Sequence, residues 1–195
     1  MTRRISTRAG YGNLTNLPTI ETDRLILRKM TPGDAEAIFA YASNLEVTRY
    51  VVWDTHRTIE DSKAFLDLTV RGYESGADPA WGVVYKGDHR FIGTCGFASL
   101  EPEHARAEIG YVISREYRGR GLAPEAVRAM ISFGFREMGL HRIEARCIAE
   151  NAASARVMQK AGMTHEGTLR QREFIKGGYR DMEMYSILKG EHRPR

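Results

Sequence analysis

The fold is decided by a short run of small and basic residues in the middle of the chain: Arg118-Gly119-Arg120-Gly121-Leu122-Ala123-Pro124-Glu125-Ala126. This run separates a strand-like segment that ends near Ile113 from a helical pattern over 124–138. Glycines let a backbone turn tightly and approach a ligand closely. The first amides of the helix lack acceptors within it and lie at the positive end of its dipole. We therefore expect an anion site of the size of a pyrophosphate.

Two familiar phosphate-binding motifs are excluded. No Gly-Lys-Ser/Thr follows the glycines, so the run is not a Walker loop. The preceding strand follows other strands and does not begin a βαβ unit, so it is not a Rossmann fingerprint either. Taken alone, the run also fits a glycine-rich turn with solvated arginines.

Outward from this run, hydrophobic periodicity predicts an alternation of strands and helices. The predicted elements are a strand over 24–28, helices starting at Thr31 and Thr58, strands over 80–85, 90–97 and 108–113, a helix over 124–138, a strand over 142–147, a helix over 151–161 and strands over 169–175 and 181–188. The three strands between 80 and 113 indicate an antiparallel meander. The whole predicts an α/β (α+β) three-layer domain, with a mixed sheet flanked by helices.

Composition limits the possible classes of protein. The 195 residues are 42% hydrophobic and 28% charged, with a net charge of +4, which is typical of one globular domain. We expect a flexible basic arm over 1–18, a single domain over 19–190 and a tail over 191–195. No run reaches the ~20 apolar residues of a membrane span, and no apolar stretch follows the early arginines as in a secretory signal. A cytoplasmic location is the simplest.

Metal and nucleic-acid functions find little support. Cys95 and Cys147 are far apart without C-x-x-C spacing, and the six histidines show no ligand spacing, so we expect no metal. The arginines are spread along the chain, which argues against nucleic-acid binding as the main function. Nucleic-acid binding through the basic arm is an alternative that salt-dependent association would test.

A second constellation opens the helix predicted after residue 150: Asn151-Ala152-Ala153-Ser154. Asn151 and Ser154 lie one turn apart on one helix face. Their simplest roles are those of a helix cap and a first-turn residue. Together with the glycine-rich run, however, the pair indicates a shared ligand site.

With these motifs the chain resembles the GNAT superfamily of N-acetyltransferases. The superfamily motif Arg/Gln-x-x-Gly-x-Gly/Ala is matched by Arg118, Gly121 and Ala123. The resemblance spans 19–188 and is strongest to the Rim-type branch, which acetylates the N-termini of ribosomal proteins. Its supporting motifs are Glu21-Thr22-Asp23-Arg24-Leu25, Glu108-Ile109-Gly110-Tyr111, Gly177-Gly178-Tyr179-Arg180-Asp181 and Tyr185-Ser186. The same branch also contains enzymes that act on small amines.

The resemblance implies a GNAT-type three-layer fold whose central sheet is splayed where acetyl-coenzyme A (acetyl-CoA), the cosubstrate, binds. Backbone groups of the strand over 108–113 would bind the pantetheine arm, and the loop amides would hold the pyrophosphate. Asn151 matches the asparagine that faces the cofactor. The implied cofactor-binding residues are Tyr111, Val112, Ile113, Arg118, Gly119, Arg120, Gly121, Leu122, Ala123, Asn151 and Ser154.

The resemblance also implies direct transfer of acetyl to a primary amine in a ternary complex. Ser154 matches the hydroxyl that protonates the leaving thiolate, or only hydrogen-bonds its sulfur. Glu173 matches a water-mediated base, although a carboxylate near Arg172 is equally an ion-pair partner. Glu108 is a competing base, and water alone is a third option. A base is wanted because an ammonium cannot attack a thioester, and an N-terminal amine with a pKa of ~8 needs only modest help.

The acceptor is left open by the sequence. Tyr50, Trp53 and Tyr179 are the candidates for lining its pocket. A protein N-terminus is the preferred acceptor; the alternatives are a small amine (polyamine, amino acid or antibiotic) and a non-catalytic CoA-binding module. A narrow acidic pocket would favour a small cation, and an open groove a peptide. Many family members pair as homodimers, but no residue here identifies an interface.

Overall fold

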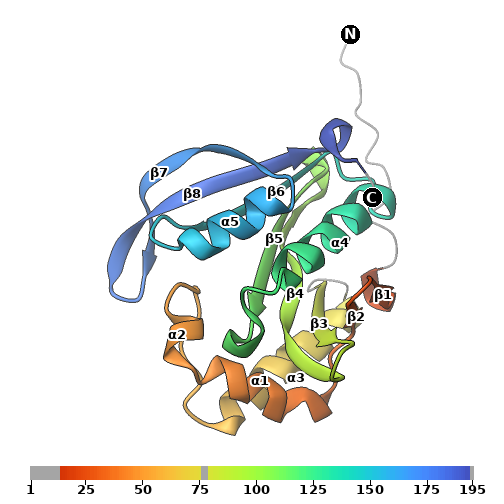
Figure 1. The fold of residues 1–195 in the computed structure, drawn as a ribbon, viewed down its shortest axis with the longest axis vertical. Helices are drawn as coiled ribbons and strands as arrows, with labels where there is room; N and C mark the ends of the chain where they lie inside the picture. Colours follow the sequence, from red (N-terminus) through yellow and green to blue (C-terminus); the bar gives the residue numbers. More distant parts are fainter. Residues whose placement is uncertain (1–13, 76–78, 194–195) are drawn as a thin grey trace.

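An eight-stranded sheet organises the chain, whose computed structural model describes residues 14–75 and 79–193 (Figure 1). The strand order is β1-β2-β3-β4-β5-β6-β8-β7, and every neighbouring pair is antiparallel except β5 with β6. The predicted mixed, mostly antiparallel sheet is thus confirmed. The strands are β1 Ile20–Glu21, β2 Leu25–Arg28, β3 Ala80–Tyr85, β4 Arg90–Glu101, β5 Arg106–Ile113, β6 Arg142–Ile148, β7 Thr164–Ile175 and β8 Gly178–Leu188.

Helices cover both faces of the sheet, as Figure 1 shows. On one face lie α4 and α5; on the other lie α1 and α3, with the short α2 below the tip of the β7–β8 hairpin. The helices are α1 Ala35–Ala42, α2 Leu45–Thr48, α3 Ile59–Ser75, α4 Leu122–Arg136 and α5 Ala152–Lys160. Helix α3 begins where predicted, directly after Thr58, and the Asp61 carboxylate accepts a 3.0 Å bond from the Thr58 amide there.

Period-two burial along the central strands divides the core into two layers. Side chains such as Trp81, Ile109 and Ile143 point to the α4 side and are almost fully buried there with Met130. A smaller cluster around Ile38 fills the space under α1 and α3. The sheet is therefore anchored on both faces, which makes it a rigid platform for a site at its centre.

The one parallel seam in the sheet is short. Strand β5 pairs with β6 only from Arg106 to Glu108, although the two strands continue to Ile113 and Ile148. Beyond Glu108 and Glu144 they diverge, so a wedge opens in the middle of the sheet. The predicted splay is thus present, and the backbone from 109 to 113 has no strand partner on the β6 side.

The N-terminal boundary differs from the expected flexible arm over 1–18. Residues 1–13 lie outside the described residues, but 14–18 are packed against the domain. Leu14–Asn16 form a 3-10 turn, Leu17 is 5% exposed, and the Pro18 carbonyl accepts a 2.8 Å bond from the Trp81 indole. Leu14 and Leu17, three residues apart, both reach the core, so residues 14–18 belong to the folded domain.

Candidate active site

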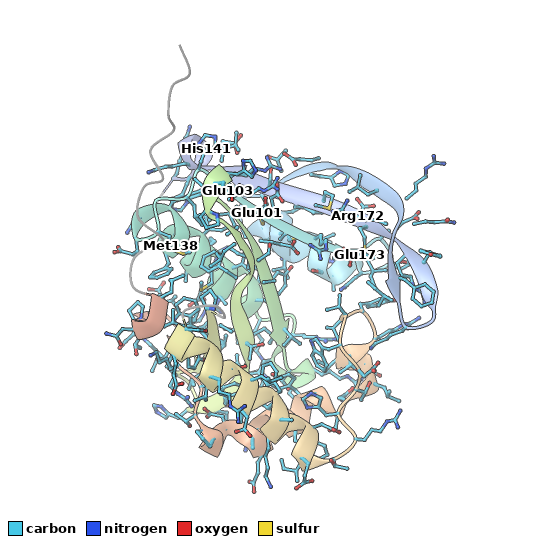
Figure 2. The ribbon with its side chains drawn as sticks, turned by 180° about the vertical axis from the view of Figure 1, so that it is seen from behind. Glu101, Glu103, Met138, His141, Arg172 and Glu173 are labelled. Atoms are coloured by element: carbon cyan, nitrogen blue, oxygen red, sulfur yellow. The ribbon has the colours of Figure 1, made fainter. Side chains whose placement is uncertain are left out.

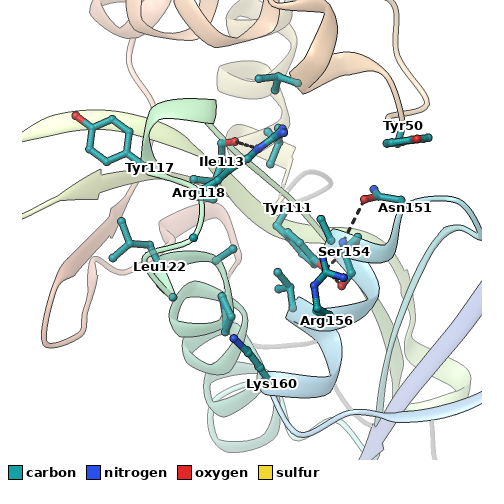
Figure 3. Close-up of a pocket in the computed structure, with 18 of the residues that line it drawn as sticks. Tyr50, Tyr111, Ile113, Tyr117, Arg118, Leu122, Asn151, Ser154, Arg156 and Lys160 are labelled. Atoms are coloured by element: carbon teal, nitrogen blue, oxygen red, sulfur yellow. Dashed lines mark hydrogen bonds between the residues drawn. The ribbon is translucent and has the colours of Figure 1, made fainter.

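A cavity of about 340 Å³ lies at the wedge between β5 and the first turns of α4 and α5 (Figure 3). It brings together residues that are far apart in the sequence. Ten of the predicted cofactor-binding residues line it: Tyr111, Val112, Ile113, Arg118, Gly119, Gly121, Leu122, Ala123, Asn151 and Ser154. The loop, the central strand and the start of α5 therefore form one site.

The glycine-rich loop turns into α4 through two left-handed glycines. Gly119 has φ 79°, and Gly121, the residue that caps α4, has φ 76°. Such angles favour glycine over any side chain with a Cβ. The loop is held from outside by Arg24, which donates 2.8 Å to the Arg120 carbonyl and pairs with Glu125 at 2.6 Å. The motif around Arg24 thus fixes the loop against the first turn of α4.

Arg120 is the exception among the predicted cofactor-binding residues. It does not line the cavity; its guanidinium lies 5.2 Å from the centre of the Tyr117 ring, outside the loop. Arg118, by contrast, lines the cavity and donates 3.4 Å to the Ile113 carbonyl, as Figure 3 shows. The difference arises because the loop runs through the left-handed Gly119, which sends its two neighbours in different directions.

Replacing Gly121 with Ala is expected to weaken CoA binding about fivefold, because a Cβ strains a backbone held at φ 76° and displaces the amides at the start of α4. The matched control is Gly139→Ala at the other end of α4, where φ is 68°. Both variants should lose similar thermal stability. Calorimetric titration with CoA separates them: equal affinity in the two would contradict the proposed role of the loop.

The start of α5 supplies a hydroxyl pair to the same cavity. The Asn151 side chain accepts 3.2 Å from the Ser154 amide and so caps the helix, and the Ser154 hydroxyl lies 2.8 Å from the Tyr111 hydroxyl (Figure 3). Burial raises the pKa of Tyr111, so its hydroxyl stays protonated and can donate. Further along the same helix, Arg156 and Lys160 also line the cavity and complement a phosphate-bearing ligand.

The opposite face of the wedge carries carboxylates. Alternation along β5 and β6 sends Ala107 and Ala145 into the core under α4, and Glu108 and Arg146 to the other side. The Arg146 guanidinium pairs with Glu108 and, at 2.6 Å, with Glu173 of β7. Figure 2, drawn from behind, shows Glu173 beside Arg172 at this face. Sequence reasoning missed Arg146; strand alternation with Glu144 was its only signal.

Glu108 is the more unusual of the two acids. Burial raises the pKa of its carboxyl, and this outweighs the nearby Arg146 charge, which lowers it. A carboxylate with a raised pKa, placed where two strands separate, is suited to accept a proton near neutral pH. Glu173 forms an ion pair, which is one of the two roles that the sequence allowed. Its partner is Arg146 and not one of the basic residues beside it in the sequence.

The three predicted acceptor residues are placed differently. Tyr50 lies at the mouth of the cavity, opposite Asn151 (Figure 3). Trp53 packs on the cluster under α1, with its ring 5.4 Å from that of His56, and Tyr179 is 66% exposed at the hairpin tip against Phe174. Neither is among the residues that line this cavity. Only Tyr50 adjoins the site.

Among residues 14–75 and 79–193, no cluster of His, Cys, Asp or Glu could hold a metal ion. Within the same residues no helix has the length and apolar character that crossing a membrane requires. Both cysteines are buried and unpaired, and burial raises the pKa of the Cys95 thiol to about 12, so we assign Cys95 no nucleophilic role.

Comparison with known proteins places this site in a family. The model of the acetyltransferase (GNAT) domain matches residues 24–164. The uncharacterized N-acetyltransferase YoaA of Bacillus subtilis (strain 168) is 42% identical over 172 residues, 88% of this chain and 97% of that protein. The ribosomal-protein-serine acetyltransferase of Escherichia coli (strain K12) is 30% identical over 135 residues, 69% of this chain and 70% of that one.

A solved structure agrees with these matches. The acetyltransferase (GNAT family) from Bacillus anthracis superposes with a TM-score of 0.80 at 34% identity, covering 89% of this chain and 99% of that one. The family model spans well over half of the chain, and the sheet carries the splayed wedge described above. The chain therefore belongs to the GNAT family of acetyl-CoA-dependent N-acetyltransferases.

Proposed function

We propose that this N-acetyltransferase acetylates the N-terminal α-amine of a protein, by direct attack of the amine on acetyl-CoA bound in the wedge. One observation carries the proposal: the wedge has a hydroxyl pair on its α5 side and a carboxylate cluster on its other side. The two groups that amine acetylation needs, one for the leaving sulfur and one for the amine proton, thus lie on the two sides of the wedge.

The cavity residues fit acetyl-CoA. The loop from 118 to 123 leads into free helix amides, with Arg118 beside them, which suits a pyrophosphate. The unpaired backbone from 109 to 113 offers donors and acceptors to the two amides of a pantetheine arm. A bound acetyl-CoA would supply the activated acyl group; the chain's own residues orient it and move protons.

On the amine side we assign the base to Glu108. Its raised pKa brings it closer to that of an N-terminal ammonium, so proton transfer, directly or through a water, costs less. Arg146 holds the Glu108 carboxylate and is itself held by Glu173. Glu173 then acts as a positioning residue that keeps Arg146 in place.

On the sulfur side we assign Ser154 as the hydrogen-bond donor to the leaving thiolate. The Tyr111 hydroxyl lies 2.8 Å from the Ser154 hydroxyl and can donate a hydrogen bond to it. A serine hydroxyl is a weak acid, so its contribution is to stabilise developing negative charge. A free amide of β5 can do the same for the carbonyl oxygen of the thioester.

A peptide acceptor is supported by the shape of the entrance. Past Tyr50, two further cavities continue between α2 and the β7–β8 hairpin, so the entrance is an open groove. An extended chain terminus can occupy such a groove with several successive residues. The likeness to the ribosomal-protein-serine acetyltransferase of Escherichia coli, at 30% identity, supports the same class of acceptor.

Thiol release from acetyl-CoA, measured across N-terminal peptides, spermidine and an aminoglycoside, tests the proposal. We expect release with peptides, and a drop in kcat of about 10- to 100-fold in Ser154→Ala with little change in KM for the peptide, because the hydroxyl acts on the leaving group. Mass spectrometry should place the acetyl group on the α-amine. The control is Ser75→Ala, at the exposed end of α3.

Three results would decide against parts of the proposal. Release with small amines alone would move the acceptor to that class. Acetylation of lysine side chains with a blocked N-terminus would reject the α-amine. Tight CoA binding without release to any amine would leave a CoA-binding module of the same fold.

A further inference from the structure

The acceptor groove has an electrostatic signature beyond its shape. A cavity of about 170 Å³ shares Tyr50 with the acetyl-CoA site, and a larger one of about 920 Å³ adjoins it further out. Three residues line both outer cavities, and all three are basic: Arg49, Lys176 and Arg180. The path away from the thioester therefore passes between fixed positive charges.

These cations are not neutralised by the protein. None of the three forms an ion pair with a carboxylate among the described residues. The Arg49 guanidinium lies 5.1 Å from the centre of the Tyr50 ring, and the Lys176 ammonium donates to the Thr48 carbonyl. Both therefore have defined positions without losing their charge to an acidic partner.

Acidic residues at the rim do not reverse this balance. Glu46, which lines the larger cavity, is paired at 2.7 Å with Arg115. The other acidic residues that line the two outer cavities are Asp54 and Glu150. A fourth cation, Arg57, also lines the larger cavity. Cations gathered in a groove repel one another, and this repulsion is relieved when an anionic partner enters.

From this arrangement we infer that the acceptor is an N-terminal peptide with acidic side chains within its first few residues, held by Arg49, Lys176 and Arg180 while its amine reaches the wedge. The inference rests on the proposed function and narrows its substrate class. The same charges would repel a polyamine, which works against the small-cation alternative.

The test measures kcat/KM for three hexapeptides that share their first residue and carry acidic, neutral or basic side chains at positions two to four. The acidic peptide should exceed the basic one about tenfold at low salt, and the gap should narrow in about 0.5 M salt. In the Arg49→Gln/Arg180→Gln variant kcat/KM for the acidic peptide should fall and the preference should move towards unity, with affinity for CoA nearly unchanged. Arg71→Gln/Arg136→Gln, on exposed positions of α3 and α4, is the matched control.

Equal rates with all three peptides, or a preference that survives in the Arg49/Arg180 variant, would overturn the inference while leaving the proposed function intact. If no peptide is acetylated, the peptide acceptor itself fails, and aspartate and spermidine then replace the peptides. Faster acetylation of spermidine would overturn the anionic preference too, whereas faster acetylation of aspartate would uphold it for a small acceptor.

Discussion

Replacement of Glu108 with Gln is expected to lower kcat about 10²- to 10³-fold, with little change in affinity for CoA. The carboxylate lies where β5 leaves β6, on the face opposite the Ser154–Tyr111 pair, and is the acceptor that we propose for the amine proton. Glutamine keeps the side-chain length and still accepts a hydrogen bond from Arg146, but it cannot take a proton. Stopped-flow or steady-state thiol release with the best peptide measures kcat for the variant and the parent protein.

The pH dependence provides an independent check. Glu108 must be ionised to act, so kcat should fall as pH drops through its raised pKa, and the variant should lose this acidic limb. A folded-state pKa above the unfolded value means that the folded protein favours the protonated form. Its contribution to stability is thus present below the unfolded pKa and is lost as pH rises through the folded pKa.

At neutral pH the ionised carboxylate is therefore a cost to folding, and Glu108→Gln should keep or raise the melting temperature. A fall in activity without a fall in stability separates a chemical role from a structural one. If Glu108→Gln retains full kcat and Glu173→Gln does not, the base is Glu173; if both retain it, water alone suffices.

Replacement of Gly93 with Ala is expected to lower stability by about 3 kcal/mol, and the melting temperature by about 10 °C. A Cβ at this position in β4 would lie 2.0 Å from the Val112 carbonyl oxygen and 3.0 Å from the Ile113 Cα, both in the neighbouring backbone. A backbone cannot give way as a flexible side chain does, so β5 must shift along the wall of the wedge. Both the melting temperature and the affinity for CoA should fall.

Gly110→Ala is the matched control for this variant. It lies in β5, paired with Gly96 of β4, and an added Cβ there would meet only the Ala98 Cβ, at an ordinary 3.5 Å. The same chemical change should leave the melting temperature within about 2 °C. A similar loss in both variants would show that the contact with Val112 is not the cause.

Much of the fold could be predicted because local signals agreed with it. Gly139 and Gly162, which directly follow the helices predicted over 124–138 and 151–161, have φ 68° and 93°, and the alternation over 142–147 matches the buried positions of β6. The loop, Asn151 and Ser154 were named from motifs and line one cavity. Their amides and caps are local features, so the sequence around each one carries the information.

What depended on long-range pairing could not be predicted. Arg146 meets Glu173 only because β8 and β7 follow β6 at the edge of the sheet, and no local pattern specifies that order. The Arg120 carbonyl is held by Arg24, which is almost a hundred residues away in the chain. The short helix α2 was also missed, since its four residues, Leu45–Thr48, are too few for a periodic pattern.

The three-residue seam between β5 and β6 gives this sheet an edge in its interior. Edges normally lie at the rim, where unpaired backbone groups attract a further strand. Here the backbone groups of β5 that lack a β6 partner line the wedge, and a ligand with its own amide groups can form hydrogen bonds with them. Binding of the cosubstrate there would then also stabilise the folded sheet by mass action.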